Sequence, residues 1–441
     1  MVTEIAKTEN EYLTAFQKLR QSSPTAAWAE LVRGSAMDRF EQLGFPTVKH
    51  EDWKYTNLAP LLKQKISPAV RPKNFQDLNA SITGYQYAET HVVLVNGFLN
   101  AELSSLSGSG AVVVLDLFEA IADDRYGKIT REYLARNAKY HDNGLAALNT
   151  AFMQSGVFVL IPKDTKLETP LQITFIANAS ESGTANFPRV LIVSEENSSA
   201  TVLETYASTG DTSYLTNAVV EIVLKEGARL EHYRVQRENK NALHLATTAT
   251  ELGRGSSYDT TSITLGGQLS RHDISVVMDH EGAECWVDGL YIVGANQHAD
   301  THSLIDHKQP YCNSHQLYKG ILDGNGRAVF NGKVFVRPGA QKTDAMQTNK
   351  NLLLSANARV DTKPQLEIFA DDVKCAHGAA VGQIDEEELF YLHTRGINPA
   401  LARNLLTYGF AEEVIGKIKI DSLRSQLDQA VLNQIEARLV A

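Results

Sequence analysis

Hydrophobic residues recur at helical spacing near the start of the chain. Tyr12, Phe16 and Leu19 lie three or four residues apart, and similar runs continue until Gly44 and Pro46. Apolar residues at this spacing share one face of a helix, and glycine and proline are typical of helix ends. We therefore predict a mainly helical N-terminal domain, placed at residues 1–150.

The pattern changes near residue 156 to short runs of β-branched and aromatic residues separated by Gly, Asn, Asp and Ser, which predict strands and turns. Turn sequences at Gly227, Gly255 and Gly282, spaced roughly 27 residues apart, each precede a new run, and Asn357 begins another. A regular alternation of turns and strands with almost no helical spacing favours the stacked coils of a solenoid over a sandwich. The predicted fold is mainly β, with a parallel β-helix core at residues 151–382.

Helical spacing returns beyond residue 382. Residues 386–394 predict a short helix, and Asn398 followed by Pro399 predicts the start of a second helix that ends at Gly409. The apolar residues between 423 and 435 predict a terminal amphipathic helix, whose apolar stripe requires a partner surface. We assign residues 383–441 to a C-terminal helical domain.

Composition narrows the functional classes. Hydrophobic residues make up 43% and charged residues 21% of the chain, which excludes a disordered or collagen-like protein. The formal net charge of −10 argues against a nucleic-acid binder, because neutralising phosphates requires a concentrated basic surface. The N-terminus lacks the features of a secretory signal and no stretch is apolar enough to cross a bilayer, so we expect a cytoplasmic protein without a membrane partner.

Motifs of several enzyme classes are absent from the sequence, including H-E-x-x-H, C-x-x-C, G-x-S-x-G and G-x-G-x-x-G. The segment 326–334 comes closest to a phosphate-binding P-loop. Its glycine spacing is one residue too long, and Val334 stands where the magnesium-binding Ser or Thr would be. We therefore expect a non-catalytic chain that does not hydrolyse ATP.

Possible metal ligands are concentrated between residues 298 and 315. They are His298, Asp300, His302, His307, Cys312 and His315. If residues 298–302 form a strand, His298, Asp300 and His302 project from one face, where they would suit zinc or iron. The alternative, a polar and solvent-facing side of the solenoid, is the better supported of the two without a further cue.

A second pair lies at Cys375 and His377, which share one side of a strand if the segment is extended. Thiolate and imidazole could ligate a soft or borderline metal, or form a Cys-His nucleophile pair; a structural Cys beside an exposed His is the simplest alternative. Because iron–sulfur clusters ordinarily take four protein ligands, another subunit would have to supply the rest. The other cysteines, Cys285 and Cys312, lie far away in the sequence, so we expect reduced thiols and no disulfide framework.

Several longer motifs make a family resemblance visible. They are NGKVFV at 331–336, AQKTDA at 340–345, QTNKNLLL at 347–354, KPQLEI at 363–368, DDVKCAHGA at 371–379, LFYL at 389–392, RGI at 395–397 and EDWKYT at 51–56. These segments closely resemble the SufD family of iron–sulfur cluster assembly scaffolds. The related SufB family shares the architecture, but RPGA at 337–340 and CAHG at 375–378 follow SufD.

The resemblance implies a right-handed parallel β-helix flanked by helical domains. It also implies a scaffold subunit of the SUF system that pairs with a SufB-like subunit through the β-helices and binds a SufC-like ABC ATPase through its C-terminal domain. His377 resembles the family histidine at the subunit interface, a ligand of iron or of a transient cluster, and Cys375 is its neighbour. The implied ATPase-docking residues are Leu405, Leu406, Tyr408, Gly409 and Phe410.

Some expectations remain open at this point. A reduced flavin is associated with complexes of this family, but no nucleotide motif assigns it to this chain, and the isolated chain could also form a homodimer. A carbohydrate-active β-helix such as a lyase, using Asp300, Asp306 and Arg327, is one rival function. A purely structural partner of SufB is another.

Overall fold

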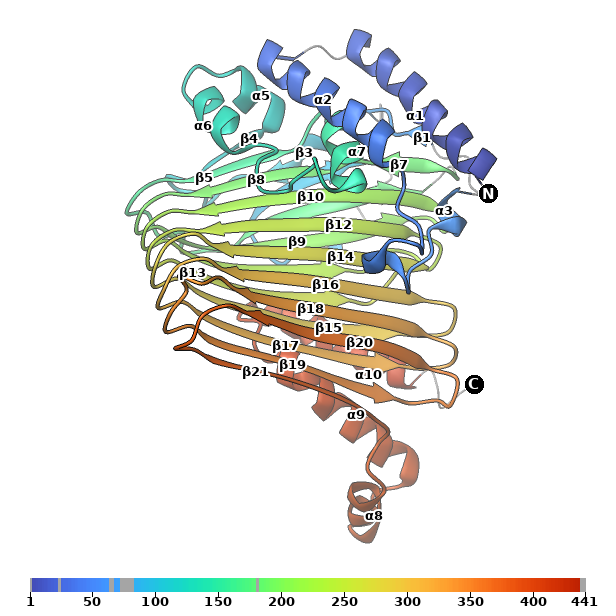
Figure 1. Ribbon diagram of the computed structural model, residues 1–441. Coiled ribbons are helices and arrows are strands. Elements are labelled where there is room, and N and C mark those ends of the chain that lie inside the picture. Colours follow the sequence, from blue (N-terminus) through green and yellow to red (C-terminus); the bar gives the residue numbers. More distant parts are fainter. Residues whose placement is uncertain (1, 23–24, 63–66, 72–82, 180–181, 437–441) are drawn as a thin grey trace.

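The computed structural model describes residues 2–22, 25–62, 67–71, 83–179 and 182–436. Two long sheets run along the molecule, with helices at both ends of the chain (Figure 1). From β5 onward, successive long strands alternate between the sheets, and each pairs in parallel with the equivalent strand of the next coil. The predicted mainly β fold with a parallel β-solenoid core is confirmed.

The strands divide between two sheets, which we call sheet A and sheet B. Sheet A contains β1 (Ser67–Pro68), β4 (Val113–Asp116), β5 (Val157–Ile161), β7 (Thr184–Asn186), β8 (Arg189–Ser194), β10 (Tyr214–Leu224), β12 (Leu243–Leu252), β14 (Leu269–Met278), β16 (His298–His307), β18 (Arg327–Val336) and β20 (Arg359–Ile368). Sheet B contains β2 (Thr90–Val95), β3 (Phe98–Ser105), β6 (Leu171–Asn178), β9 (Ser199–Thr209), β11 (Arg229–Gln236), β13 (Ser257–Thr264), β15 (Glu284–Val293), β17 (Asn313–Leu322), β19 (Asp344–Leu353) and β21 (Lys374–Gly382).

The helices lie before and after the solenoid. They are α1 (Val2–Ser22), α2 (Ala27–Leu43), the 3-10 helix η1 (Glu51–Trp53), α3 (Ala59–Leu62), α5 (Leu117–Ala122), α6 (Tyr126–Tyr133), α7 (Gly144–Phe152), α8 (Glu386–Thr394), α9 (Pro399–Ile415) and α10 (Asp421–Glu436).

Turn residues set the length of each coil. Gly227, Gly255 and Gly282 have φ angles of 67°, 58° and 72° in the turns that lead into β11, β13 and β15. Positive φ is costly for residues with a Cβ atom, which explains why glycine recurs there. Asn357 lies in the turn between β19 and β20, which joins the sheets in the opposite direction. The repeat visible in the sequence therefore combines two rows of turns.

The inward-facing side chains of both sheets form one elongated core of mainly Val, Ala, Leu and Ile, together with several tyrosines. Two interior tyrosines lie over glycines of the adjacent coil: Tyr318 is the register partner of Gly289, and Tyr291 is the partner of Gly320. An added Cβ atom would lie 2.1 Å from a ring carbon at either glycine. These glycines leave the space that the rings fill.

A buried polar cluster interrupts the apolar core in the first half of the solenoid. Glu204 Oε1 lies 3.0 Å from His232 Nε2, and Glu238 Oε2 lies 2.6 Å from His244 Nδ1. Arg234 contacts His244 from the same interior. Although burial acts in the opposite direction, the neighbouring histidines lower the pKa values of Glu204 and Glu238. Such polar contacts are the usual way in which a core tolerates buried carboxylates.

The N-terminal helices cover the first coils of sheet A. Arg189 and Glu221 form a buried ion pair on the outer face of this sheet. Arg189 Nη1 also donates to Asn149 Oδ1 at 3.0 Å in α7, and Glu221 Oε1 accepts from the backbone N–H of Asn137 at 2.9 Å. In the same region, β2 and β3 extend sheet B, and β4 extends sheet A. The domain boundaries at residues 150 and 382 stay predictions.

The C-terminal helices return along sheet B. Helix α8 has the predicted bounds, and the Asn398 side chain caps α9 through the N–H of Leu401 at 2.8 Å. The predicted helix end at Gly409 is wrong, because α9 continues to Ile415. Glycine in a helix costs only about 1 kcal/mol, and residues beyond it, including Val414, pack on the outer face of sheet B. That face, lined by residues such as Tyr233, is also the partner of the apolar stripe on α10.

No helix among the described residues has both the length and the apolar character that crossing a membrane requires.

Replacing Gly320 with Ala should lower the free energy of unfolding by about 1–3 kcal/mol, because the new methyl group would collide with the buried Tyr291 ring. Gly378→Ala is the matched control, since no heavy atom lies within 4 Å of the position of its Cβ atom. The control should change stability by less than about 0.5 kcal/mol. Urea unfolding of both variants tests this, and equal stability would contradict it.

Candidate functional site

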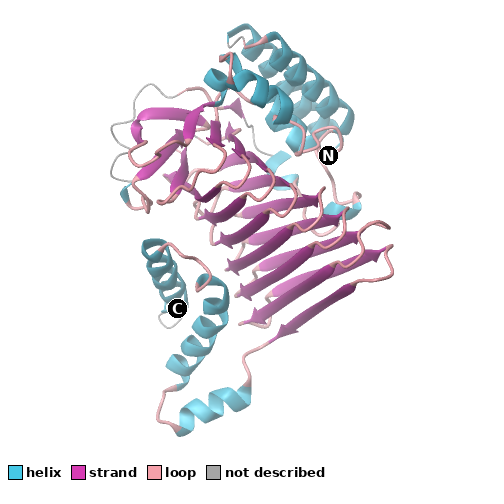
Figure 2. Cartoon of the chain, turned by 90° about the vertical axis from the view of Figure 1, so that its left-hand side faces the viewer, coloured by secondary structure: helices cyan, strands magenta, loops and turns pink. Residues whose placement is uncertain are grey.

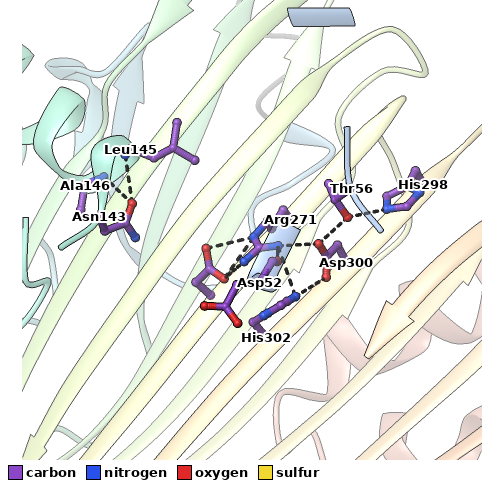
Figure 3. A network of polar contacts seen from close by, with 10 residues as sticks. Asp52, Thr56, Asn143, Leu145, Ala146, Arg271, His298, Asp300 and His302 are labelled. Atoms are coloured by element: carbon purple, nitrogen blue, oxygen red, sulfur yellow. Dashed lines mark hydrogen bonds and ion pairs between the residues drawn. The ribbon is translucent and has the colours of Figure 1, made fainter. Parts of the chain in front are cut away.

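The segment 48–56, which we call the strap, crosses the outer face of sheet A (Figure 1), and a polar network lies beneath it (Figure 3). The guanidinium of Arg271 on β14 lies 3.8 Å from the centre of the Trp53 ring. Its Nη1 atom donates to the backbone oxygen of Asp52 and to Asp300 Oδ2, both at 2.7 Å (Figure 3). Trp53 is buried and anchors the strap on this sheet.

His298, Asp300 and His302 lie on one face of β16, as predicted. Thr56 Oγ1 donates to Asp300 Oδ2 at 2.5 Å and lies 2.9 Å from His298 Nε2, while His302 Nε2 is 3.1 Å from Asp300 Oδ1 (Figure 3). Although burial acts in the opposite direction, the charges of Arg271 and His302 hold the pKa of Asp300 well below its usual range. The carboxylate therefore stays ionised and holds the strap in place.

The other possible ligands of the 298–315 segment point elsewhere. His307 faces the interior, with Nε2 2.9 Å from Ser314 Oγ, and Cys312 is buried. His315 lies on the outer face of sheet B, stacked on Trp286 with ring centres 5.6 Å apart. Within the described ranges, no three His, Cys, Asp or Glu side chains are grouped so as to hold a metal ion. The alternative prediction, a polar and solvent-facing side of the solenoid, does not describe Asp300, because the strap buries this residue.

A cleft of about 340 Å³ lies between the strap and sheet A. Its charged walls contain three lysines and three carboxylates, namely Lys49, Lys54, Lys363, Glu51, Asp52 and Asp300. Lys363 Nζ on β20 pairs with Glu51 Oε1 at 2.7 Å, so the strap reaches from β14 to the last strand of sheet A. The charges largely compensate one another, and the cleft presents no concentrated charge to a ligand.

Cys375 and His377 lie on β21, the last strand of sheet B. They are the register partners of Ala345 and Gln347 and therefore continue the inward-facing rows of the solenoid. Cys375 is half-buried against a small apolar cluster that includes Val336, whereas His377 is exposed. Burial, with a smaller contribution from Asp344, raises the pKa of the Cys375 thiol. The thiol is therefore protonated at neutral pH.

The two other cysteines are less accessible. Cys285 and Cys312 are fully buried, burial raises the pKa of both thiols, and none of the three cysteines is in a disulfide. A reactive or metal-binding role requires an accessible thiolate. Among the three, the position of Cys375 suits such a role best.

The end of the solenoid at β20 and β21 is open. Each of these strands has a hydrogen-bonded neighbour on one side, and no other described strand pairs with the opposite edge. Figure 2 shows these strands at the lower end of the ladder, without a covering helix. Ile368, Phe369 and Val381 are exposed there, with 39%, 58% and 48% of their surfaces accessible.

The predicted ATPase-docking residues lie along α9, but they face different surroundings. Leu405 and Gly409 are exposed and Leu406 is half-buried. Tyr408 and Phe410 pack against the apolar residues between α9 and sheet B, and Lys319 Nζ lies 4.2 Å from the centre of the Phe410 ring.

Sequence reasoning missed the more exposed apolar residues nearby. They are Phe390 and Tyr391 on α8 and Leu401 on α9, with 70%, 57% and 47% of their surfaces accessible. In α8, Leu389 is buried and the two aromatic residues follow it directly. Because adjacent residues on a helix point in different directions, three consecutive large apolar residues cannot all face the same partner, and this pattern is the signal in the sequence.

Comparisons with known proteins agree with this architecture. Residues 175–410 match the family described as SUF system FeS cluster assembly, SufBD core domain, and residues 6–173 match the SufBD protein N-terminal region. An iron–sulfur cluster assembly SufBD family protein of Synechocystis is 35% identical, covering 90% of this chain and 89% of the relative. The chain belongs to the SufBD family.

Two other relatives in this family carry the name SufD. The iron–sulfur cluster assembly protein SufD of Escherichia coli is 34% identical, and the alignment covers 92% of each chain. The protein of the same name from Bacillus subtilis is 26% identical over 97% of this chain and 98% of its own. In this SufBD-family chain, the EDWKYT motif at 51–56 is part of the strap, which packs on sheet A.

Replacing Asp300 with Asn should lower the free energy of unfolding by about 3 kcal/mol, because Arg271 loses one of its buried anionic partners. Asp273→Asn is the control at the other, more exposed partner of Arg271 and should cost less. The folded-state pKa of Asp300 is depressed, so its stabilisation is complete above the unfolded-state value of about 4 and is lost as the pH falls through the folded-state pKa. Urea unfolding from pH 8 to pH 3 tests this; a difference between wild type and variant that does not shrink in acid would contradict it.

Proposed function

We propose that the chain is a SufD-type scaffold subunit that hydrolyses no ATP and contributes His377 and Cys375 to an interfacial site where iron and sulfide are assembled. The observation that carries the proposal is the position of this pair on the uncovered last strand of the solenoid. Iron or a nascent cluster is the cargo of this site. The names of the SufD relatives support the same assignment.

The open end favours a second solenoid as the partner. An uncovered strand edge presents unpaired backbone N–H and C=O groups, and another strand satisfies them best. The exposed Ile368, Phe369 and Val381 would be buried in the same contact. A SufB-like subunit fits this role because it would also bring the ligands that Cys375 and His377 lack for a four-ligand cluster. A second copy of this chain would compete for the same edge in isolation.

The chemistry of the pair suits transient binding. The thiol of Cys375 has a raised pKa, so iron must displace its proton on binding, and affinity falls as the pH falls. The imidazole of His377 is exposed and supplies a nitrogen ligand without a steric barrier. A site that is half-formed in one subunit would bind cargo firmly once the other subunit is in place.

The exposed apolar residues of α8 and α9 favour a docking surface for a SufC-like ABC ATPase. Helix α8 projects beyond the last strand (Figures 1 and 2), and its main described contacts are with α9. Phe390, Tyr391, Leu401 and Leu405 remain exposed there. Aromatic residues concentrated on a small exposed surface are typical of binding hot spots.

The lyase alternative is less well supported. Asp300 is buried beneath the strap, and Asp306 forms a two-point pair with Arg337 at 3.0 Å, so neither carboxylate is available to a polysaccharide. A purely structural partner of SufB would use the same open edge and differs only in needing no ligand at His377.

Replacing His377 with Ala should leave the complex with the SufB-like subunit and the ATPase assembled but reduce cluster formation at least about tenfold, since a ligand is lost. His315→Ala, on the outer face of sheet B, is the control and should match the wild type. Size-exclusion chromatography checks assembly, and absorbance during reconstitution with iron and sulfide checks the cluster. Normal cluster formation by the His377 variant would favour the purely structural role.

Replacing Phe390 with Ala should weaken ATPase binding by about 2 kcal/mol, or roughly 30-fold in Kd. Leu31→Ala removes a similarly exposed apolar side chain from α2, at the opposite end of the molecule, and should leave the Kd unchanged. Calorimetric titration of the full chain with the ATPase measures both. Equal affinities for the two variants would place the docking surface elsewhere.

A further inference from the structure

One inward-facing row of sheet B leads to His377. Gln316 on β17 is the register partner of Gln347 on β19, and Gln347 is the register partner of His377 on β21. Partners in a parallel ladder project to the same side of the sheet and lie about 4.8 Å apart along it. The Gln347 side chain is therefore the neighbour of His377 on the preceding strand, on the same inward-facing side of sheet B.

Hydrogen bonds fix the orientation of the Gln347 amide. Gln347 Nε2 donates to Gln316 Oε1 at 2.8 Å, and Gln316 Nε2 in turn donates to Ser303 Oγ at 2.8 Å. The Gln347 side chain is 1% exposed, and its Oε1 atom has no hydrogen-bond partner among the described residues. A buried carbonyl oxygen without a donor is unfavourable and uncommon in native proteins.

On the opposite sheet, a glycine of β18 leaves the space that the Gln347 amide occupies. A Cβ atom at Gly332 on β18 would lie 2.4 Å from Gln347 Nε2 and 2.9 Å from its Cδ. Gly332 does not have a positive φ angle. Glycine is therefore needed here because a side chain would collide with the amide, and not because of the backbone conformation. The amide is thus held between Gln316 and Gly332, with its oxygen left as an acceptor.

We propose that Gln347 is a positioning residue for His377: its free Oε1 atom accepts the ring N–H of the imidazole when the other ring nitrogen binds iron. This inference rests on the proposed function. Histidines that bind metals almost always donate their second N–H to an oxygen acceptor, which fixes the tautomer and the ring orientation. Gln347 supplies that acceptor, and Ser303 and Gln316 hold it in place.

The test uses Gln347→Leu, which removes the acceptor at similar volume, and Gln347→Glu, which keeps an oxygen at the same place. Asn351→Leu is the matched control, because Asn351 is buried on the same face of β19 and accepts from Tyr291 OH at 2.5 Å but pairs in register with Val381. The full chain, in complex with the SufB-like subunit, is titrated with Co²⁺ alone and followed by visible absorption. Proton NMR of the Co²⁺ complex follows the exchangeable ring N–H of the bound imidazole.

Gln347→Leu should weaken Co²⁺ binding by about 10- to 100-fold and abolish the slowly exchanging N–H signal, whereas Gln347→Glu should keep both. Asn351→Leu should bind Co²⁺ like the wild type even if it unfolds more easily. Wild-type binding by Gln347→Leu, or equal weakening by Asn351→Leu, would overturn the inference.

A His377→Ala titration separates the two levels of the argument. If this variant loses Co²⁺ binding while Gln347→Leu retains it, the positioning role fails and the proposed function stands. If His377→Ala binds Co²⁺ like the wild type, the proposed function fails and the role of Gln347 fails with it.

Discussion

Each strand of the solenoid forms in-register backbone hydrogen bonds with the equivalent strand of the next coil, as far as β20 and β21. Since side chains alternate along a strand, this register decides which residues face inward and which neighbours they meet. A shift of one residue would turn Cys375 and His377 outward and bring their neighbours inward. The interior tyrosines and their partner glycines oppose such a shift, because each ring fits only opposite a residue without a side chain.

Features that depend on local pattern were predictable from the sequence. Alternating runs and turn glycines predict the solenoid, and the spacing of apolar residues predicts the helix Glu386–Thr394. Features that depend on distant contacts were not: α9 continues through Gly409 because residues beyond it pack on sheet B. The strap was equally hidden, because Asp52 meets Arg271 across 219 positions of sequence. The common side of Cys375 and His377 followed from alternation, but their place at an open edge required the order of the strands.

The two outer faces of the solenoid are covered by opposite parts of the chain. The strap crosses sheet A through buried ionic contacts around Arg271, whereas α9 and α10 cover sheet B through an apolar interface. Lys363 and Lys319 extend these attachments to β20 and β17 respectively. Both coverings thus stabilise the faces of the coils and leave the hydrogen-bonding edge of the last coil free. The contacts that cover the two sheet faces are therefore separate from the free edge of the last coil.

The return of α10 along sheet B also bears on how the protein is made. Leu203, Tyr233 and Ile263 belong to middle coils, yet Leu423, Leu427 and Val431, which share their apolar cluster, come much later in the chain. While the ribosome translates the intervening segment, at some 5–20 residues per second, that sheet face lacks the cover that α9 and α10 later provide. The nascent solenoid therefore emerges with an apolar face that is covered only once α9 and α10 have been made, and during this interval a chaperone has a defined surface to protect.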